Sequence, residues 1–271
     1  MSALADAERA AAEAGVRIAL LESAAETRAA AEVLRAVWPN EAGMPMPAEL
    51  MRAMAHADSY VAGVYVEDRL VGAAAAFHVR PASLHSHITG VLASVRGRSV
   101  GYALKMHQRA WALERGIGHI LWTFDPLIRR NAHFNINKLG ARAYEYLPDF
   151  YGPMTDVVNA GDRTDRLHVS WDLAAEHRGR GWLPEQEGAV VVATAPDGGP
   201  VTTPAPPDAP RLLVALPADV EALRERNASL ALRWRTAVRE ALEPAMAAGY
   251  TVTGLAEPGI YVLDHPTTAR G

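Results

Sequence analysis

The order of apolar segments along the chain predicts an α/β or α+β fold. Short runs rich in β-branched and aromatic residues recur through the sequence, and a smaller number of amphipathic helical segments lies between them. Strands that alternate with helices in this way are typical of these two fold classes. The chain has 271 residues, of which 49% are hydrophobic, and this is enough to build a large buried core.

The composition narrows the classes of function. A net charge of −4 without a long basic run argues against nucleic acid as a partner. The chain has no cysteine, which excludes disulfides, thiolate catalysis and cysteine-bound zinc and fits a reducing compartment. The most apolar run, Leu70 to Val79, is too short to cross a bilayer, and residues 1–15 lack the features of a signal peptide. We therefore expect a cytoplasmic protein that does not bind membranes.

The first segments predict helices around a β-hairpin. Residues 1–15 read as an exposed or loosely docked helical extension, and a short strand follows over 16–21. A helix begins after Ser23, because Ser23 and Glu26 have the spacing of a capping box. A short helix spans 47–55. Two β-rich runs then flank Glu67-Asp68, which predicts a hairpin turn.

A strand at 84–95, a loop and a helix come next. The helix begins near Ser99 and ends at Gly116. Its apolar residues recur at helical spacing, and Lys105, Gln108 and Arg109 lie off that stripe. The apolar set consists of Val100, Ala103, Leu104, Ala110, Trp111 and Leu113.

The second half of the chain predicts more strands than helices. "HILWTF" reads as a buried strand that ends at Asp125, and residues 129–140 form a short helix closed by Gly140. Further strands follow at 141–147 and 165–173. Residues 176–210 contain a Pro/Gly-rich stretch and are interpreted as a linker. Residues 211–271 predict a β-α-β-β unit that packs on the main domain (16–175), with a kink or end of its helix at Pro244.

The loop "RGRSVG", Arg96 to Gly101, carries the strongest functional signal. It leaves a strand and opens a helix, and the first amide groups of a helix lack internal partners. Small residues let a ligand approach the backbone closely, and two arginines add charge. The pattern fits a pyrophosphate, although a simple turn before a helix is an open alternative.

With the later segment "AHFNINKLGARAY", this loop resembles the GNAT superfamily of acyl-CoA-dependent N-acyltransferases. The resemblance covers about 60–147 and extends more loosely to a bacterial branch with a similar C-terminal unit. It implies a mixed, mostly antiparallel sheet flanked by helices, with the strands near Leu92 and Trp122 splayed apart. It further implies that Arg96, Gly97, Arg98, Ser99, Val100 and Gly101 hold the CoA pyrophosphate and that Val91 and Leu92 pair with pantetheine. The family signature has glycine at Ser99, and we expect that serine at a helix start does not need a positive φ.

Candidate catalytic residues follow from the needs of acyl transfer to an amine. His85 and His87 share a strand face and suit proton transfer at neutral pH, or are polar residues at a strand start. Zinc binding by these two with His78 is a weak alternative, and we expect no metal. The tyrosine that many family members use as acid is replaced by Ile136, so Tyr144, Tyr146 or Tyr151 is considered instead.

Other polar residues have two interpretations each. Asp125 is either a site residue or part of a turn. Asn131 and Asn135 bind CoA or cap a helix, and Arg129 and Arg130 contact anionic groups of the ligand or face solvent. The stretch "HRGRGW" at 177–182 also combines arginine with glycine, but no helical pattern follows it, so we interpret it as an ordinary loop.

The leading hypothesis is an enzyme that moves an acetyl or succinyl group from acyl-CoA to the amine of a small molecule such as an amino acid. The alternative is a non-catalytic acyl-CoA-binding or scaffold protein with the same fold, which Ile136 and Ser99 favour. The pattern leaves open whether the protein forms a homodimer.

Overall fold

The computed structural model describes residues 2–38, 44–79, 82–152, 162–175 and 179–266. The described chain forms two compact units. The first contains the residues up to Trp122 together with Asp172–Ala174, and the second contains most of the chain from Thr123 onward. The boundary between the units therefore lies inside a strand, earlier than the expected domain end at 175.

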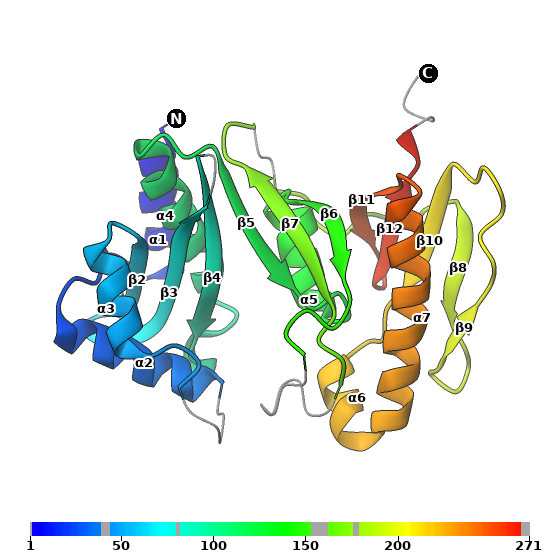
Figure 1. Ribbon diagram of the computed structural model, residues 1–271, viewed down its shortest axis with the longest axis horizontal. Coiled ribbons are helices and arrows are strands. Elements are labelled where there is room, and N and C mark those ends of the chain that lie inside the picture. Colours follow the sequence, from blue (N-terminus) through cyan, green and yellow to red (C-terminus); the bar gives the residue numbers. More distant parts are fainter. Residues whose placement is uncertain (1, 39–43, 80–81, 153–161, 176–178, 267–271) are drawn as a thin grey trace. The chain divides into compact units, whose positions relative to one another are not determined.

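The sheet of the first unit has the strand order β1-β2-β3-β4-β5 (Figure 1). Its neighbours are antiparallel except for β4 and β5, which are parallel. The turn at Glu67-Asp68 joins β2 to β3, which confirms the predicted hairpin. The strands are β1 (Arg17–Leu20), β2 (Tyr60–Val66), β3 (Arg69–Val79), β4 (Ser83–Val91) and β5 (His119–Phe124).

Two pairs of helices accompany this sheet (Figure 1). Helices α2 (Ala24–Val37) and α3 (Ala48–His56) cover one face, where Leu34 and Met51 are buried against Val61. The predicted capping box of Ser23 and Glu26 is present at the start of α2. Helices α1 and α4 pack against each other, and Trp111 of α4 contacts Tyr60 on the other face of β2.

Helix α1 (Ala3–Ala14) is more firmly docked than its composition predicts. It buries Ala7, Ala10 and Ala14, and Asp6 approaches Arg109 of α4 (Val100–Glu114) at 3.8 Å. The small alanine side chains allow close contact between the helices, so the expectation of a loosely attached extension is wrong.

The second unit has the strand order β7-β6-β11-β12-β10-β8-β9, in which only β10 and β8 are parallel. Both units thus confirm the mixed, mostly antiparallel prediction. Residues 189–202 contribute β8 and β9 to the sheet, so this part of the expected linker is structural. The strands are β6 (Arg142–Leu147), β7 (Arg166–Asp172), β8 (Ala189–Thr194), β9 (Pro200–Thr202), β10 (Arg211–Ala215), β11 (Thr251–Ala256) and β12 (Ile260–Asp264).

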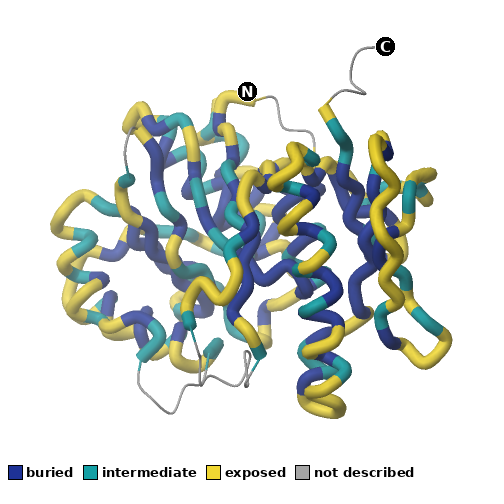
Figure 2. Tube along the Cα trace, turned by 45° about the vertical axis from the view of Figure 1, so that its right-hand side comes forward, coloured by how far each residue is buried: buried dark blue, intermediate teal, exposed yellow. Residues whose placement is uncertain are grey.

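The helices of the second unit begin with α5 (Arg129–Ala132), which continues into a π-helical turn, η2 (His133–Lys138). The C-terminal segment has the predicted β-α-β-β order, but its helix is divided into α6 (Val220–Arg226) and α7 (Ala228–Ala247). Helix α7 passes Pro244 and ends at Ala247. It buries Trp234, Val238 and Leu242, while the loops between elements are largely exposed (Figure 2).

The C-terminal strands extend the sheet of this unit. Strand β11 pairs with β6 through Val252 and Ala143, so the β-α-β-β unit adds strands directly to a part of the expected main domain. Leu213 of β10, Ala256 of β11 and Val262 of β12 form a small buried cluster there.

Candidate functional site

An opening between β4 and β5 marks the candidate site in the first unit. The two strands pair only through Ser83↔His119, Leu84↔Ile120 and His85↔Leu121. Beyond these pairs β4 runs on to Val91, and the described residues of β5 make no further pair with it. This confirms the expected divergence of the strands. It leaves one edge of the β4 backbone open to a ligand.

The loop after β4 is built as a strained, exposed turn. A 3-10 turn, η1 (Ala93–Val95), is followed by Arg96, Gly97 and Arg98, which are all exposed. Gly97 has φ +82°, where a glycine avoids the strain of a side chain. Ser99 has φ +60°, so the expectation that this serine avoids a positive φ is wrong. Its left-handed conformation turns the chain into α4 and costs on the order of 1 kcal/mol.

The start of α4 has the features of an anion site. The Ser99 side chain caps none of the first amide groups of the helix, and the first helical hydrogen bond runs from the Ala103 amide to the Ser99 carbonyl at 3.0 Å. The Gly101 Cα faces open space, because an added Cβ would meet no atom within 4 Å. The Arg98 guanidinium lies beside Gly15, at the C-terminal end of α1, where the helix dipole is negative.

His85 and His87 lie together on one face of β4. Their ring centroids are 6.2 Å apart, and the Phe77 ring is 5.0 Å from that of His85. A β-bulge interrupts the pairing here, because Ala75 pairs with Ile88 while Ala76 pairs with Ser86, and His87 is the extra residue. Burial lowers the pKa of His87. His87 therefore carries less positive charge at neutral pH than an ordinary histidine.

The opposite face of β4 meets a buried lysine that the sequence did not indicate. Lys105 of α4 is only 6% exposed, and its Nζ donates to Ser86 Oγ at 2.9 Å and to Gln108 Oε1 at 3.2 Å. The ammonium also lies 4.1 Å from the ring centroid of Trp122 in β5. Lys105 and Gln108 lie off the apolar stripe of α4, yet both are buried because α4 is covered by the sheet on one side and by α1 on another.

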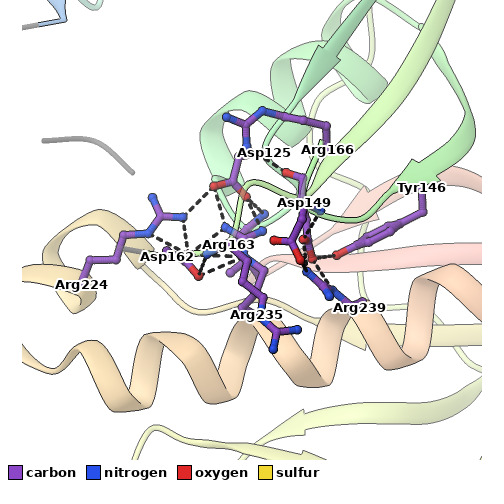
Figure 3. A network of polar contacts seen from close by, with 11 residues as sticks. Asp125, Tyr146, Asp149, Asp162, Arg163, Arg166, Arg224, Arg235 and Arg239 are labelled. Carbon is purple, nitrogen blue, oxygen red and sulfur yellow. Dashed lines mark hydrogen bonds and ion pairs between the residues drawn. The ribbon is translucent and has the colours of Figure 1, made fainter. Parts of the chain in front are cut away.

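Asp125 belongs to a buried ion-pair network in the second unit (Figure 3). Its Oδ1 accepts from the Leu127 amide and from Arg235, and its Oδ2 accepts from Arg224 and Arg235 at 2.7 and 2.8 Å. The Arg235 and Arg224 guanidinium groups hold the pKa of Asp125 well below its usual range, against the opposing effect of burial. A carboxylate held in this way is a poor proton acceptor, and its bond to Leu127 is the expected turn contact.

The network continues through a second carboxylate and its partners (Figure 3). Asp162 Oδ2 accepts from Arg224 at 2.8 Å and from Arg235 at 2.9 Å. Asp165 accepts from Arg239 and, at 2.6 Å, from the Tyr146 hydroxyl. These contacts give Tyr146 a structural role and tie α6 and α7 to the loops around β5 and β7.

The remaining candidates also lie in the second unit. The Tyr144 side chain is about half exposed, and its hydroxyl lies 2.6 Å from the His168 ring nitrogens. Partial burial together with the charge of Glu145 raises the pKa of Tyr144 to about 12. Asn135 is buried, and its carbonyl oxygen accepts from the Ala141 amide. Asn131 is half-buried in α5.

The residues around them are mostly held by the fold. Ile136, at the position of the family's usual tyrosine, is buried in η2. Arg129 donates to the Leu216 carbonyl at 2.8 Å, and Arg130 pairs with Glu221. Tyr151 lies 3.3 Å from the Thr123 hydroxyl.

The second Arg/Gly stretch has a structural place. Its Arg180 amide donates to the Asn137 carbonyl, and the Asn137 side chain donates to the Gly181 carbonyl. No helix begins directly after it in the described residues, where β8 is the next element, as expected for an ordinary loop. His177 and Arg178 lie outside the described residues.

The described residues contain neither a candidate membrane helix nor a candidate metal cluster. Within the described ranges, no helix combines the length and the apolar character that a membrane span requires. In the same ranges, no three His, Cys, Asp or Glu side chains gather where they could hold a metal ion. The imidazole of His78 instead lies 2.9 Å from the Asp58 carbonyl.

The unpaired part of β4, the arginine-bearing loop and helix α4 all lie within one segment that resembles a known family. Residues 21–140 match the model of the acetyltransferase (GNAT) family. The match covers most of the segment that carries the resemblance drawn from the sequence and supports that resemblance.

Several solved structures are similar over about three fifths of the chain. The ribosomal-protein-S18-alanine N-acetyltransferase from Escherichia coli has 15% identity and a TM-score of 0.49, over 60% of this chain and 97% of its own. The aminoglycoside 6'-N-acetyltransferase from Enterococcus faecium has 17% identity and a TM-score of 0.46, over 60% of this chain and 99% of its own. The comparison with curated protein sequences found no match.

Proposed function

We propose that this protein transfers an acetyl or succinyl group from acyl-CoA to the amine of a small molecule such as an amino acid. The observation that carries the proposal is the exposed loop from Arg96 to Gly101, which follows a strand with an open edge and opens α4. The GNAT match over 21–140 includes this loop.

The loop would hold the CoA pyrophosphate. Backbone amides at the start of α4 favour an anion, and Arg96 and Arg98 supply charge. Gly97, Ser99, Val100 and Gly101 complete the loop, and the open space beside Gly101 leaves room for phosphate. Asn131 and Asn135, which belong to the second unit, remain candidates for further CoA contacts.

The pantetheine arm would run along the open edge of β4. The Leu92 amide already donates to the Val71 carbonyl of β3 at 2.9 Å. Because neighbouring residues direct their backbone groups to opposite sides of a strand, Val91 presents its own N–H and C=O groups away from β3. This geometry supports Val91 more than Leu92 as the residue that would pair with pantetheine, and the thioester would then lie in the opening between β4 and β5.

His85 and His87 are proposed as the proton acceptors. An amine is mostly protonated at neutral pH and loses a proton before it attacks the thioester carbonyl. The lowered pKa of His87 keeps this ring neutral and able to accept that proton. Asp125 is the less suitable base because two arginines hold its charge. Tyr144 remains a candidate acid, although a raised pKa makes it a weaker proton donor.

A non-catalytic acyl-CoA-binding protein is the second candidate. The observation that favours it is the identity of Ile136. This buried residue occupies the position where many family members carry the tyrosine that acts as the general acid. Such a protein would bind CoA without turnover.

The deciding experiment combines binding with turnover. Calorimetry with CoA tests the loop, and release of free thiol from acetyl-CoA or succinyl-CoA with a panel of amino acids and other amines tests catalysis. Thiol release that depends on the amine supports the enzyme, and CoA binding without thiol release supports the second candidate. If CoA neither binds nor is released, both functions are refuted and only the fold assignment stands. The cytoplasmic location and the homodimer expected from the sequence stay predictions.

A further inference from the structure

Lys105 is a buried cationic group in the first unit, and no carboxylate among the described residues pairs with it. Its Nζ contacts Ser86 of β4, Gln108 of α4 and the Trp122 ring of β5, all of which are uncharged. Lysine is rarely buried unless it is paired with an acid, because a buried charge loses its hydration. The fold therefore keeps an energetically costly amine at this position.

The Lys105 amine lies close to the last residue pair between β4 and β5. Ser86 directly follows His85, the last residue of β4 that pairs with β5, and Trp122 directly follows its partner Leu121. Nζ thus lies between the two strands at the point where they begin to diverge. It also lies on the face of β4 opposite His85, the residue before Ser86, since side chains alternate along a strand up to the bulge.

Gln108 supplies an independent sign of a missing partner. This side chain is 1% exposed, and its Oε1 accepts from Lys105. Its Nε2 is buried and makes no hydrogen bond within the described residues. Buried amide donors are normally satisfied, so an acceptor from a ligand would complete the site.

We propose that Lys105 is the proton donor to the CoA thiolate that leaves when the acyl group is transferred. This inference rests on the proposed function. It supplies a proton donor where Ile136 replaces the tyrosine that many family members use as the acid. As the new C–N bond forms and the C–S bond breaks, the electron pair goes to sulfur. Nζ–H then gives its proton to sulfur, which yields free CoA thiol and a neutral lysine. The proton that the acceptor amine loses goes to the base on β4, and solvent restores the proton of Lys105.

The electrostatic setting suits this task. Burial lowers the pKa of Lys105 to about 7, so the ammonium is present near neutral pH and releases its proton readily. Neither of its hydrogen-bond partners is titratable. The titratable or charged side chains on the elements packed around it are Asp6, Glu8, Arg9 and Glu13 of α1, Tyr60 and Tyr65 of β2, Arg69 and His78 of β3, His85 and His87 of β4, Tyr102, His107, Arg109 and Glu114 of α4, and His119 of β5.

The decisive measurement uses the wild-type protein. The chain contains only two lysines, Lys105 and Lys138, so protein labelled with ¹³C at the lysine ε-carbon gives two signals, and a Lys138→Arg variant assigns them. Both are titrated in the free protein, with the sulfonate analogue of CoA, in which a permanently anionic sulfonate replaces the thiol, and with desthio-CoA, which lacks the sulfur. If Nζ lies beside the sulfur position, its pKa is higher by about 1 to 3 in the sulfonate complex than in the desthio-CoA complex, because the anion stabilises the ammonium.

The outcomes separate this inference from the proposed function. Equal Lys105 pKa values in the two complexes would overturn the role of Lys105 while leaving CoA binding and turnover intact. Failure of CoA to bind would overturn the proposed function and this inference with it.

Two variants test proton donation by a second route. Lys105→Arg keeps the positive charge but cannot release a proton near neutral pH. We expect a similar KM for acyl-CoA and a kcat lower by roughly 10²- to 10⁴-fold. Lys105→Met should show a comparable loss.

The leaving group supplies the control for these variants. In an acyl-seleno-CoA, selenium replaces the sulfur of CoA. Its leaving selenolate is a much weaker base than the thiolate and departs without a proton. The deficit of both variants should therefore largely disappear with it. A deficit of equal size with the thioester and the selenoester, or full activity of Lys105→Arg, would contradict proton donation.

Discussion

Replacing Arg235 with methionine should strongly destabilise the second unit. Arg235 is 0% exposed and donates to Asp125 at 2.8 Å through two nitrogens and to Asp162 at 2.9 Å. In the wild type, two arginines balance two carboxylates. Arg235→Met removes one of these buried positive charges, while Arg224 stays hydrogen-bonded to both carboxylates and Arg166 stays close to Asp125. One buried negative charge thereby loses its hydrogen-bonded arginine.

The expected cost follows from the loss of that partner. Removal of one partner from a buried ion pair lowers the free energy of unfolding by about 3 to 5 kcal/mol. For a urea m-value of about 2 kcal/mol per molar, the denaturation midpoint falls by about 1.5 to 2.5 M. Methionine is close in length to the aliphatic part of arginine, so the loss reports charge more than packing.

Urea denaturation followed by circular dichroism measures this change. Arg233→Met is the matched control, because Arg233 lies on the same helix and is exposed, and we expect an effect within about 0.5 kcal/mol. Adding Asp125→Asn to Arg235→Met should recover part of the loss, since it removes the excess negative charge. A loss below about 1 kcal/mol for Arg235→Met, or no recovery in the double variant, would refute the assigned role of the buried charges.

Three further predictions concern the site and its pH dependence. Gly101→Glu should abolish CoA binding in calorimetry while the protein stays folded, because the new side chain enters open space and places a negative charge at the anion site; unchanged affinity would remove the loop from the CoA site. His87→Ala, or failing that His85→Ala, should lower kcat without a large change in CoA affinity and should remove the rise of rate with pH below about 6.5, since the pKa of His87 is lowered; wild-type pH profiles for both variants would make the histidines structural. The low pKa of Asp125 predicts that its stabilising contribution is complete above about pH 4, the unfolded value, and is lost as pH falls through the lower folded value. Arg235→Met should therefore show a shallower loss of stability between pH 5 and 3 than the wild type, and parallel curves would argue against this linkage.

Local sequence signals determined the secondary structure that builds the candidate site. The β-rich runs around Glu67-Asp68 form the predicted hairpin, and Ser23 with Glu26 forms the predicted capping box. The loop from Arg96 to Gly101 joins a strand to a helix as its residue pattern indicates. Turn residues, caps and side-chain periodicity act over a few neighbouring residues, so their effects can be predicted from the chain alone.

Conformational detail in that loop was only partly predictable. Ser99 adopts a positive φ because the turn into α4 requires it, although the residue type disfavours it. The short strand β9 forms in a Pro/Gly-rich stretch because β8 offers it an edge to pair with. For β9, pairing with a neighbouring strand outweighs local preference.

Tertiary structure alone decided which polar groups are buried and what charge they carry. Asp125 acquires its low pKa from Arg235, which lies 110 residues away along the chain. Lys105 lies off the apolar stripe of its helix, yet packing against β4, β5 and α1 removes it from water and lowers its pKa to about 7. Desolvation and ion pairing depend on distances between elements remote in sequence, and residue spacing carries no direct record of those distances.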